Sequence, residues 1–246
     1  MNADHFAQLR LLDLQAADTA LAQLLHKRKT LPELAAIAAR SERNAALHND
    51  GVDAKTRASD IAAEQRRLEN DVDAVRTRAA RDEQRLLAGG LPAKELASLQ
   101  HEITTLARRQ SSLEDELLEI MEQRESADSA VAAIAAQRAA LSAELADLVA
   151  ARDSAFADID AAAAARSAER AAVAVEIPPE LLALYERARE HGNGVGAAVL
   201  RVRRCEGCHM ELSGSELAAV RSAEPDAVVR CDNCRRILVR TAESGL

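Results

Sequence analysis

The feature that most constrains this chain is a heptad repeat of apolar residues, which starts just after Lys94 and continues without a slip through 20 seam positions. Sixteen of these positions are apolar, and their alternating spacing of three and four is typical of a left-handed coiled coil. The polar exceptions recur every fourteen residues, at Gln110, Arg124, Arg138 and Arg152. Polar seam residues commonly fix the register of a coiled coil at some cost in stability. A helix of this kind needs a long helical partner.

One strong helix breaker, Gly89-Gly90-Leu91-Pro92, divides the helical part of the chain into two arms. In a helix interior each glycine costs roughly 1 kcal/mol and a proline about 3 kcal/mol. The two arms, residues 4–88 and 93–172, are nearly equal in length, so we expect them to pair as an antiparallel hairpin. An extended intermolecular coiled coil is the alternative. Thr30-Leu31-Pro32-Glu33 looks like a capping box and predicts a break inside the first arm.

Composition supports thin, paired helices rather than a thick core. Hydrophobic residues make up 48% of the 246 residues, but aromatics make up only 1%, as two Phe, one Tyr and no Trp. Aromatic rings dominate the energetics of ordinary cores, so β sandwiches and most enzyme scaffolds are disfavoured.

Charge and hydropathy bear on the compartment and on the class of partner. The formal net charge of −8 argues against binding a polyanion through bulk charge, so a nucleic-acid site would have to be local. The longest stretch without a charged residue, 191–200, is far shorter than a membrane span requires. The first ten residues show no apolar signal region. We therefore expect a cytoplasmic protein that does not contact the membrane.

Two Cys-x-x-Cys units near the end of the chain predict a zinc ribbon. Cys205 and Cys208 form the first unit, and Cys231 and Cys234 form the second. Each unit presents two thiolates from one tight turn, and two such turns complete a tetrahedron around a single Zn²⁺. Four thiolates close the coordination shell, whereas catalytic zinc keeps an open position, so we expect one structural zinc ion. The binding free energy of the metal would also help so small a domain to fold.

These patterns predict a mostly α-helical protein with three segments. Residues 1–172 form a long antiparallel coiled-coil hairpin with its turn at 89–92, and residues 173–196 form a linker with a short helix. Residues 197–246 form a small, β-rich, four-cysteine zinc ribbon.

This combination resembles a bacterial C4-type zinc-ribbon family with an N-terminal coiled-coil hairpin. The resemblance rests on the turn and helix from Gly89 to Glu102, on the segment Ile177-Pro178-Pro179-Glu180-Leu181-Leu182, and on the four cysteines with Arg236-Ile237-Leu238. It implies that the four cysteines are the zinc ligands, and that an alternative sigma factor, a secretion component or RNA is the kind of partner to expect. Arg235 stands where the family often has glycine, and Val239 where an aromatic residue is common.

The sequence leaves two functions open. One is a non-enzymatic adaptor or chaperone-like protein that binds another protein, and the alternative is a regulatory protein that binds RNA or DNA. Residues 201–240 contain eight arginines against six acidic residues, and guanidinium groups suit phosphates. The candidate nucleic-acid contacts are Arg201, Arg203, Arg204, Arg230, Arg235, Arg236 and Arg240.

Two observations weigh against nucleic acid as the main partner. Four thiolates with one Zn²⁺ carry a charge of about −2, which offsets the arginine excess. The ribbon segment has no aromatic residue on which bases could stack. We therefore expect a protein partner first. We expect no enzyme activity, because the six histidines are scattered and suggest no catalytic constellation. The identity of the partner and the oligomeric state stay open.

Overall fold

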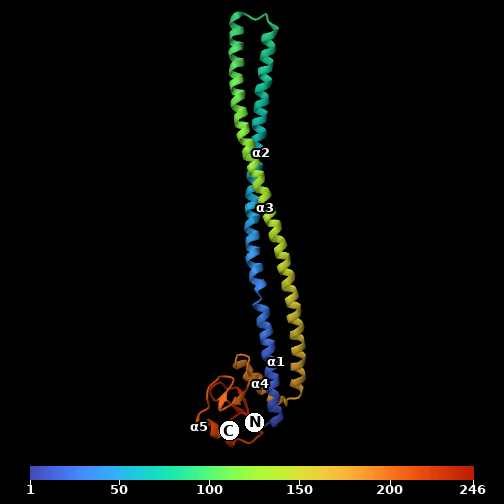
Figure 1. Cartoon of the computed structure of the whole chain (residues 1–246), viewed down its shortest axis with the longest axis vertical. Coiled ribbons are helices and arrows are strands. Elements are labelled where there is room, and N and C mark those ends of the chain that lie inside the picture. The colour runs from blue at the N-terminus through green and yellow to red at the C-terminus, as the bar shows by residue number, and fades with distance from the viewer. The chain divides into compact units, whose positions relative to one another are not determined.

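The computed structural model describes all 246 residues, Met1–Leu246, and is mostly helical (Figure 1). The helices are α1 (His5–Lys29), α2 (Pro32–Ala88), α3 (Ala93–Val175), α4 (Pro179–His191) and α5 (Gly214–Ser222). The strands are β1 (Ala197–Arg201), β2 (Arg204–Cys205), β3 (Val229–Arg230) and β4 (Ile237–Val239). The chain forms two compact units, which we call the hairpin unit (residues 35–149) and the ribbon unit (residues 1–34 and 150–246). None of the helices has an apolar stretch that could span a bilayer.

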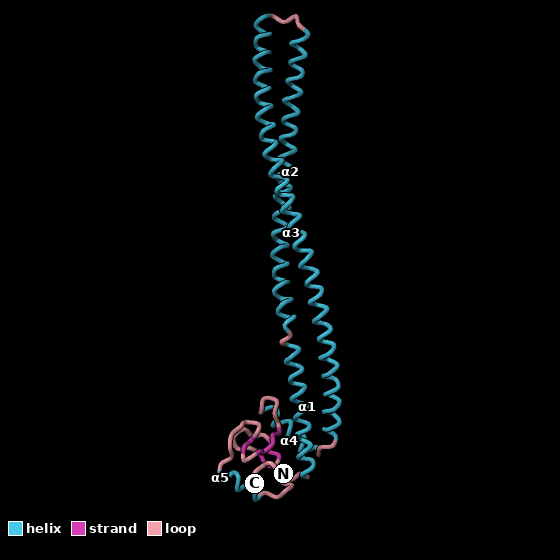
Figure 2. Tube along the Cα trace, viewed as in Figure 1, coloured by secondary structure: helices cyan, strands magenta, loops and turns pink.

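The turn of the hairpin unit lies where the breaker predicted it. Helix α2 ends at Ala88 and α3 begins at Ala93, and a short loop joins them (Figure 2). Gly89 and Gly90 have φ angles of +68° and +78°, a backbone region that glycine enters without the steric cost of a Cβ atom. The two helices can therefore reverse direction within four residues, and the predicted antiparallel hairpin is confirmed.

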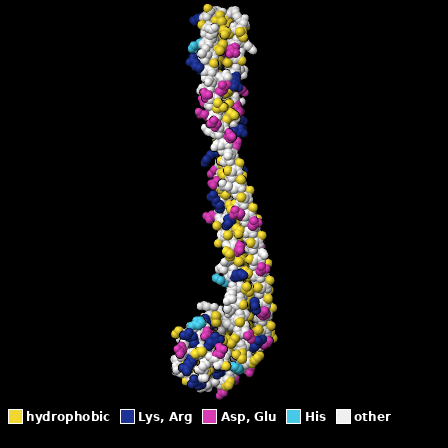
Figure 3. Space-filling view, viewed as in Figure 1, with side chains coloured by type: hydrophobic (Ala, Val, Ile, Leu, Met, Phe, Trp, Pro, Cys, Tyr) yellow, Lys and Arg dark blue, Asp and Glu magenta, His cyan; other side chains and the backbone are white.

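The seam of the hairpin unit buries the predicted apolar residues and is flanked by charged pairs. Leu68 and Val72 of α2 pack against Leu113 of α3 as a small buried cluster. Ion pairs cross between the helices, including Arg76 to Glu114 at 2.7 Å and Arg40 to Glu144 at 2.9 Å. Exposed pairs of this kind each contribute little to stability. Figure 3 shows acidic and basic side chains interspersed with apolar ones along these helices. Because the exposed pairs contribute little, the buried apolar seam contributes most of the pairing free energy.

The predicted break in the first arm is present, but the predicted capping box is wrong. Helix α1 ends at Lys29 and α2 begins at Pro32 (Figure 2). Thr30 caps the C-terminus of α1: its backbone N–H and its hydroxyl both donate to the carbonyl of His26, at 3.0 and 2.9 Å. The hydroxyl is therefore not available to the first turn of α2, and one carboxylate oxygen of Glu33 is buried without a partner.

The ribbon unit has a core to which both ends of the chain contribute. Its sheet has the order β2-β1-β4-β3, with β1 and β4 parallel and the outer pairs antiparallel. Apolar side chains of α1 and α4 pack on one face of this sheet. The buried residues of this cluster are Ala3, Ala7, Leu11, Leu14, Ile177, Leu181, Tyr185, Ala197, Ile237 and Val239. The start of the chain also bonds to the segment before β3: the Ala3 N–H donates to the Asp226 carbonyl at 2.8 Å.

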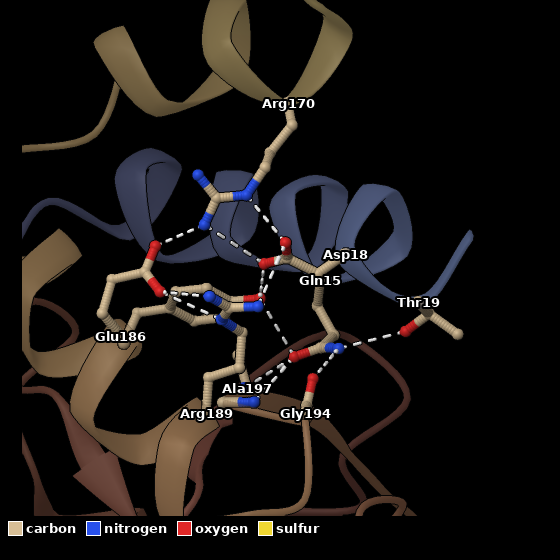
Figure 4. A network of polar contacts seen from close by, with 10 residues as sticks. Gln15, Asp18, Thr19, Arg170, Glu186, Arg189, Gly194 and Ala197 are labelled. Atoms are coloured by element: carbon tan, nitrogen blue, oxygen red, sulfur yellow. Dashed lines mark hydrogen bonds and ion pairs between the residues drawn. The ribbon is translucent and has the colours of Figure 1, made fainter. Parts of the chain in front are cut away.

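A buried polar network ties α1 to the rest of the ribbon unit (Figure 4). The Gln15 side-chain oxygen accepts a hydrogen bond from the Gly196 N–H at 2.7 Å, just before β1. The Asp18 carboxylate accepts from the Tyr185 hydroxyl of α4 at 2.7 Å and from Arg170 of α3 at 2.7 Å. Burial and the Asp18 hydrogen bond both raise the pKa of Tyr185, which keeps the phenol protonated as the donor. Helices α1, α3 and α4 therefore meet at one carboxylate.

We predict that Gln15→Ala destabilises the ribbon unit by about 2 kcal/mol, because it leaves buried backbone groups without partners. Gln15 is 8% exposed, and its amide nitrogen also donates to the Gly194 carbonyl at 3.1 Å. The exposed Gln23 on the same helix provides a matched control, Gln23→Ala. Urea unfolding, followed by Tyr185 fluorescence, measures the difference. Equal stability of the two variants would contradict the assignment.

Candidate metal centre and the ribbon surface

The two Cys-x-x-Cys turns have the same backbone hydrogen bonds. In the first turn, the His209 N–H donates to the Cys205 carbonyl at 2.7 Å, and the Cys205 N–H donates to the Met210 carbonyl at 3.0 Å. In the second turn, Arg235 donates to Cys231 at 2.8 Å, and Cys231 donates to Arg236 at 2.9 Å. The residue after each second cysteine is left-handed, with φ of 59° at His209 and 62° at Arg235. The sequence thus builds two equivalent knuckles.

The knuckles bring the four cysteine sulfurs together as one donor set. All four sulfur atoms lie within 4.8 Å of one another. The Cys205 and Cys234 sulfurs are 3.8 Å apart, and so are those of Cys208 and Cys231. A tetrahedral zinc ion with Zn–S bonds of about 2.3 Å requires S–S separations of about 3.8 Å. The residues present therefore fit one four-coordinate zinc ion, and they leave no position for a water ligand.

The thiols differ in how readily they ionise. Burial raises the pKa of Cys205 and of Cys231 above the ordinary thiol value. Burial also opposes ionisation of Cys234, but hydrogen bonds from the Arg236 N–H and from neighbouring thiols outweigh it and lower its pKa to about 7. Because zinc binds thiolates, metal binding here displaces protons from the buried thiols.

Three of the seven arginines predicted to contact nucleic acid donate to backbone carbonyls of the ribbon, and Arg236 and Arg240 do so through several bonds each. The Arg236 guanidinium donates to the carbonyls of Gly192, Val195 and Gly207, at 2.6, 3.1 and 2.8 Å. Arg240 donates to carbonyls that follow the end of α5, including Ala223 at 2.9 Å and Ala227 at 3.0 Å. Both side chains therefore link loops whose carbonyls have no strand partner.

The other predicted arginines lie in different surroundings. Arg201 and Arg204 line a shallow pocket together with Glu206 and Glu211, and Arg201 also pairs with Glu243 at 2.8 Å. Arg203 is exposed in the turn between β1 and β2. Arg230, at the end of β3, and Arg235, in the second knuckle, line one pocket together, and Arg230 donates to the Arg235 carbonyl at 2.9 Å.

Arg230 and Arg235 join residues of α4 in what we call the basic pocket. Its lining consists of Leu184, Arg187, Ala188, His191, Arg230 and Arg235, and its volume is about 260 Å³. No acidic residue lines this pocket. Sequence reasoning missed Arg187 and His191. Their spacing of four places them on one exposed face of the short helix, but nothing in the sequence indicates that this face lies beside the second knuckle.

Comparison with known proteins agrees with this architecture. The family model of the CT398-like coiled coil hairpin domain matches residues 14–193, and that of the C4-type zinc ribbon domain matches residues 204–238. The chain belongs to the CT398-like coiled-coil hairpin family. Its C4-type ribbon holds one structural zinc ion, as the cysteine spacing predicted.

Relatives of this CT398-like protein match it over nearly the whole chain. The uncharacterized protein Rv2229c of Mycobacterium tuberculosis is 41% identical over 242 residues, which cover 98% of both chains. A solved structure from Mycobacterium smegmatis has a TM-score of 0.87 at 34% identity and covers 98% of this chain and 100% of that one. CT398 from Chlamydia trachomatis has a TM-score of 0.72 at 18% identity, with 96% and 98% coverage. The CT398 likeness shows the fold alone.

We predict that removing zinc unfolds the ribbon of this CT398-like protein while the hairpin unit stays helical. The four thiols are buried or half-buried, and without the metal the small domain loses the binding free energy that stabilises its fold. A strong chelator should therefore abolish the dispersed ribbon signals in an NMR spectrum, faster at pH 6 than at pH 8 because protons compete for the thiolates. Cys208→Ser should reproduce the effect, whereas Ser215→Cys is a control that changes no ligand. Retention of the ribbon signals in metal-free protein would contradict the prediction.

We further predict that Arg235→Gly stabilises the zinc-loaded ribbon by about 1 kcal/mol, because glycine adopts a positive φ without the steric cost of a side chain. Asn233→Gly is the control, since Asn233 in the same knuckle has no positive φ and glycine there only adds freedom to the unfolded chain. Thermal unfolding of the two zinc-loaded variants measures the contrast. A lower melting temperature for Arg235→Gly than for the unmodified chain would show that its side chain contributes more than the strain costs.

Proposed function

We propose that the protein is a non-enzymatic adaptor that binds a partner protein, and that the basic pocket receives an acidic segment of that partner. The observation that carries the proposal is the chemistry of the pocket lining. Leu184 and Ala188 supply an apolar floor, while three arginines and a histidine supply the rim. Arginine beside an apolar surface is enriched at the energetic centres of protein interfaces.

The charges of the pocket are available for a partner. Arg187, Arg230 and Arg235 take no part in the ion pairs of the ribbon unit, which link Arg10, Arg28, Arg152, Arg166, Arg170, Arg189 and Arg201 to acidic groups. By contrast, the pocket lined by Arg201 and Arg204 contains its own acidic residues. Guanidinium groups form paired, charge-assisted hydrogen bonds with carboxylates. An acidic side chain of a partner therefore suits the basic pocket better than it suits the pocket of Arg201 and Arg204, whose positive charge is already neutralised.

A structural role for the zinc supports the non-enzymatic part of the proposal. The four thiolates fill the coordination shell, whereas a catalytic zinc ion needs a position for water or substrate. The zinc therefore fixes the two knuckles, and with them Arg230 and Arg235 on either side of the second one.

Nucleic acid is the second candidate, because the same arginines suit phosphate groups. Such binding would follow the nucleic-acid backbone and would weaken with salt, since the ribbon segment 197–246 offers no aromatic side chain for base stacking. The apolar floor of the pocket favours a peptide instead.

The test uses fluorescence anisotropy with two probes at two salt concentrations: an acidic peptide that contains one leucine, and single-stranded RNA. We expect the full-length, zinc-loaded protein to bind the peptide, and Arg187→Glu/Arg235→Glu to weaken binding at least about tenfold through charge repulsion. Arg221→Glu, at an exposed arginine of α5 away from the pocket, is the matched control and should bind normally. Zinc content and melting temperature confirm that each variant is folded.

Binding of the RNA but not of the peptide would favour the second candidate. Failure of both probes, or equal binding by the pocket variant and the control, would overturn the proposed use of the pocket. Arg236 is unsuitable for this test, because its replacement removes three hydrogen bonds to backbone carbonyls and so disturbs the ribbon itself.

A further inference from the structure

The hairpin unit is not closed along its whole length. Three surface pockets open between residues 48–65 of α2 and 118–138 of α3. They lie farther from the turn at 89–92 than the buried cluster of Leu68, Val72 and Leu113 does. Large apolar side chains are exposed in this stretch: Val52 is 50%, Leu118 is 60% and Met121 is 46% exposed. Large apolar side chains exposed beside open pockets are typical of an interaction site.

Two of the three pockets open on the same face, which we call the shared face. On α3, Asp128 lines one pocket and Ala135 lines the other, and a spacing of seven residues keeps them on one stripe of a helix. On α2, Gln65 and Gly51 line the same two pockets at a spacing of fourteen. Both helices therefore present the two pockets in one direction.

The two ends of the shared face carry opposite charge. The basic end is lined by His48, Lys55 and Arg138 together with apolar residues. The acidic end is lined by Glu122, Glu125 and Asp128, with one basic residue, Arg124, already paired to Asp128 at 3.5 Å.

Apart from the Arg124–Asp128 pair, the charges at both ends take no part in ion pairs within the chain. Lys55, Glu122 and Glu125 take no part in the ion pairs of the hairpin unit. The Nε atom of Arg138 is buried without any hydrogen-bond partner, although buried polar groups are nearly always satisfied. The two ends therefore offer unneutralised charge of opposite sign on one apolar surface.

Between the two ends of the shared face, the helix positions along its middle carry only small side chains. Ala58 and Ala62 lie there on α2, and Ser129 and Ala132 on α3. Small side chains allow another helix pair to approach to the shorter interaxial distances seen between packed helices. From Glu122 to Ala135 is thirteen residues, or about 20 Å along a helix, so the basic and acidic ends are far enough apart to be contacted separately.

We propose that the shared face binds a second copy of this chain, antiparallel to the first and related to it by a two-fold axis. A two-fold axis that passes between the two ends places each basic end over the acidic end of the other copy, so both charge contacts form at once. An apolar face with a single sign of charge would instead repel its own copy. The proposal concerns only residues 48–138, so its failure would leave the proposed use of the basic pocket untouched.

The area suits reversible association. The stretch from Leu118 to Arg138 is 21 residues, or about 30 Å, and two helices are about 20 Å wide, so each copy would cover about 600 Å². Interfaces of this size lie at the lower end of the specific range. We therefore expect a monomer–dimer equilibrium at micromolar concentrations.

The test is a charge exchange between two variants of the full-length protein, followed by sedimentation equilibrium. Lys55→Glu places an acid at the basic end, where it would lie over the acidic end of the other copy, and Glu125→Lys places a base at the acidic end, where it would lie over the basic end. Each variant alone should therefore dimerise at least about tenfold more weakly than the unmodified chain. An equimolar mixture of the two should dimerise again, because each charge contact in the mixed dimer joins opposite charges. Arg57→Glu and Glu116→Lys are matched controls: Arg57 lines the pocket on the other side of the hairpin, and Glu116 lines none of the three pockets.

Circular dichroism spectra of all variants should match, since each substituted residue is exposed. Recovery of the dimer in the mixture, with unchanged controls, supports the shared face as the interface. The proposal is overturned if the unmodified chain stays monomeric throughout the micromolar range, if the mixture fails to recover, or if the controls lose the dimer equally.

Discussion

The parallel pairing of β1 with β4 is the interaction on which the ribbon unit depends. Successive side chains of a strand point to opposite faces, and here each face has its own apolar cluster. Ala197, Ile237 and Val239 pack with α1 and α4, whereas Leu200 and Leu238 pack beside the cysteines. Because parallel strands cannot be joined by a tight turn, the chain between them has to travel around the sheet, and it does so through the first knuckle, α5 and the second knuckle.

This arrangement explains why the metal and the helices support each other. Zinc joins the first knuckle, which follows β1, to the second, which precedes β4, and so holds the two central strands in register. On the other face, α1 and α4 supply the large apolar side chains that the ribbon lacks, among them Tyr185, which is fully buried. A chain with 1% aromatic residues thus places its single tyrosine in the buried cluster that joins the helices to the sheet.

Most of the fold could be predicted from the sequence, because its main elements depend on periodicity and spacing. The heptads, the Gly-Gly-Leu-Pro turn and the paired cysteines each act locally, so residue type and separation suffice. What could not be predicted depends on which loops meet. The Leu11 and Leu14 stripe of α1 packs on the ribbon sheet, and the polar Gln15 and Asp18 on that same side bond to α3, α4 and the segment before β1.

The arginines of the ribbon show the same limit. Arg236 and Arg240 have the residue type and position of phosphate-binding groups, but both point at nearby carbonyls that loops leave without partners. Whether a guanidinium meets a ligand or its own backbone is decided by loop paths that residue type does not reveal. Arg230 donates one such bond, to the Arg235 carbonyl, but Arg230 and Arg235 also line the pocket beside α4 to which Arg187 contributes.

The polar seam positions of α3 also act differently from one another. Gln110 donates to Glu114 at 2.8 Å, and that carboxylate accepts from Arg76 of α2, so this position strengthens the hairpin. Arg124 bonds to Gln65 at 3.1 Å, and Arg138 lies in a pocket with one nitrogen unsatisfied. Seam arginines are too long and too polar to fill the space that a leucine would fill. Arg124 and Arg138 each line one of the two pockets of the shared face, so two of the polar seam positions coincide with the open part of that surface.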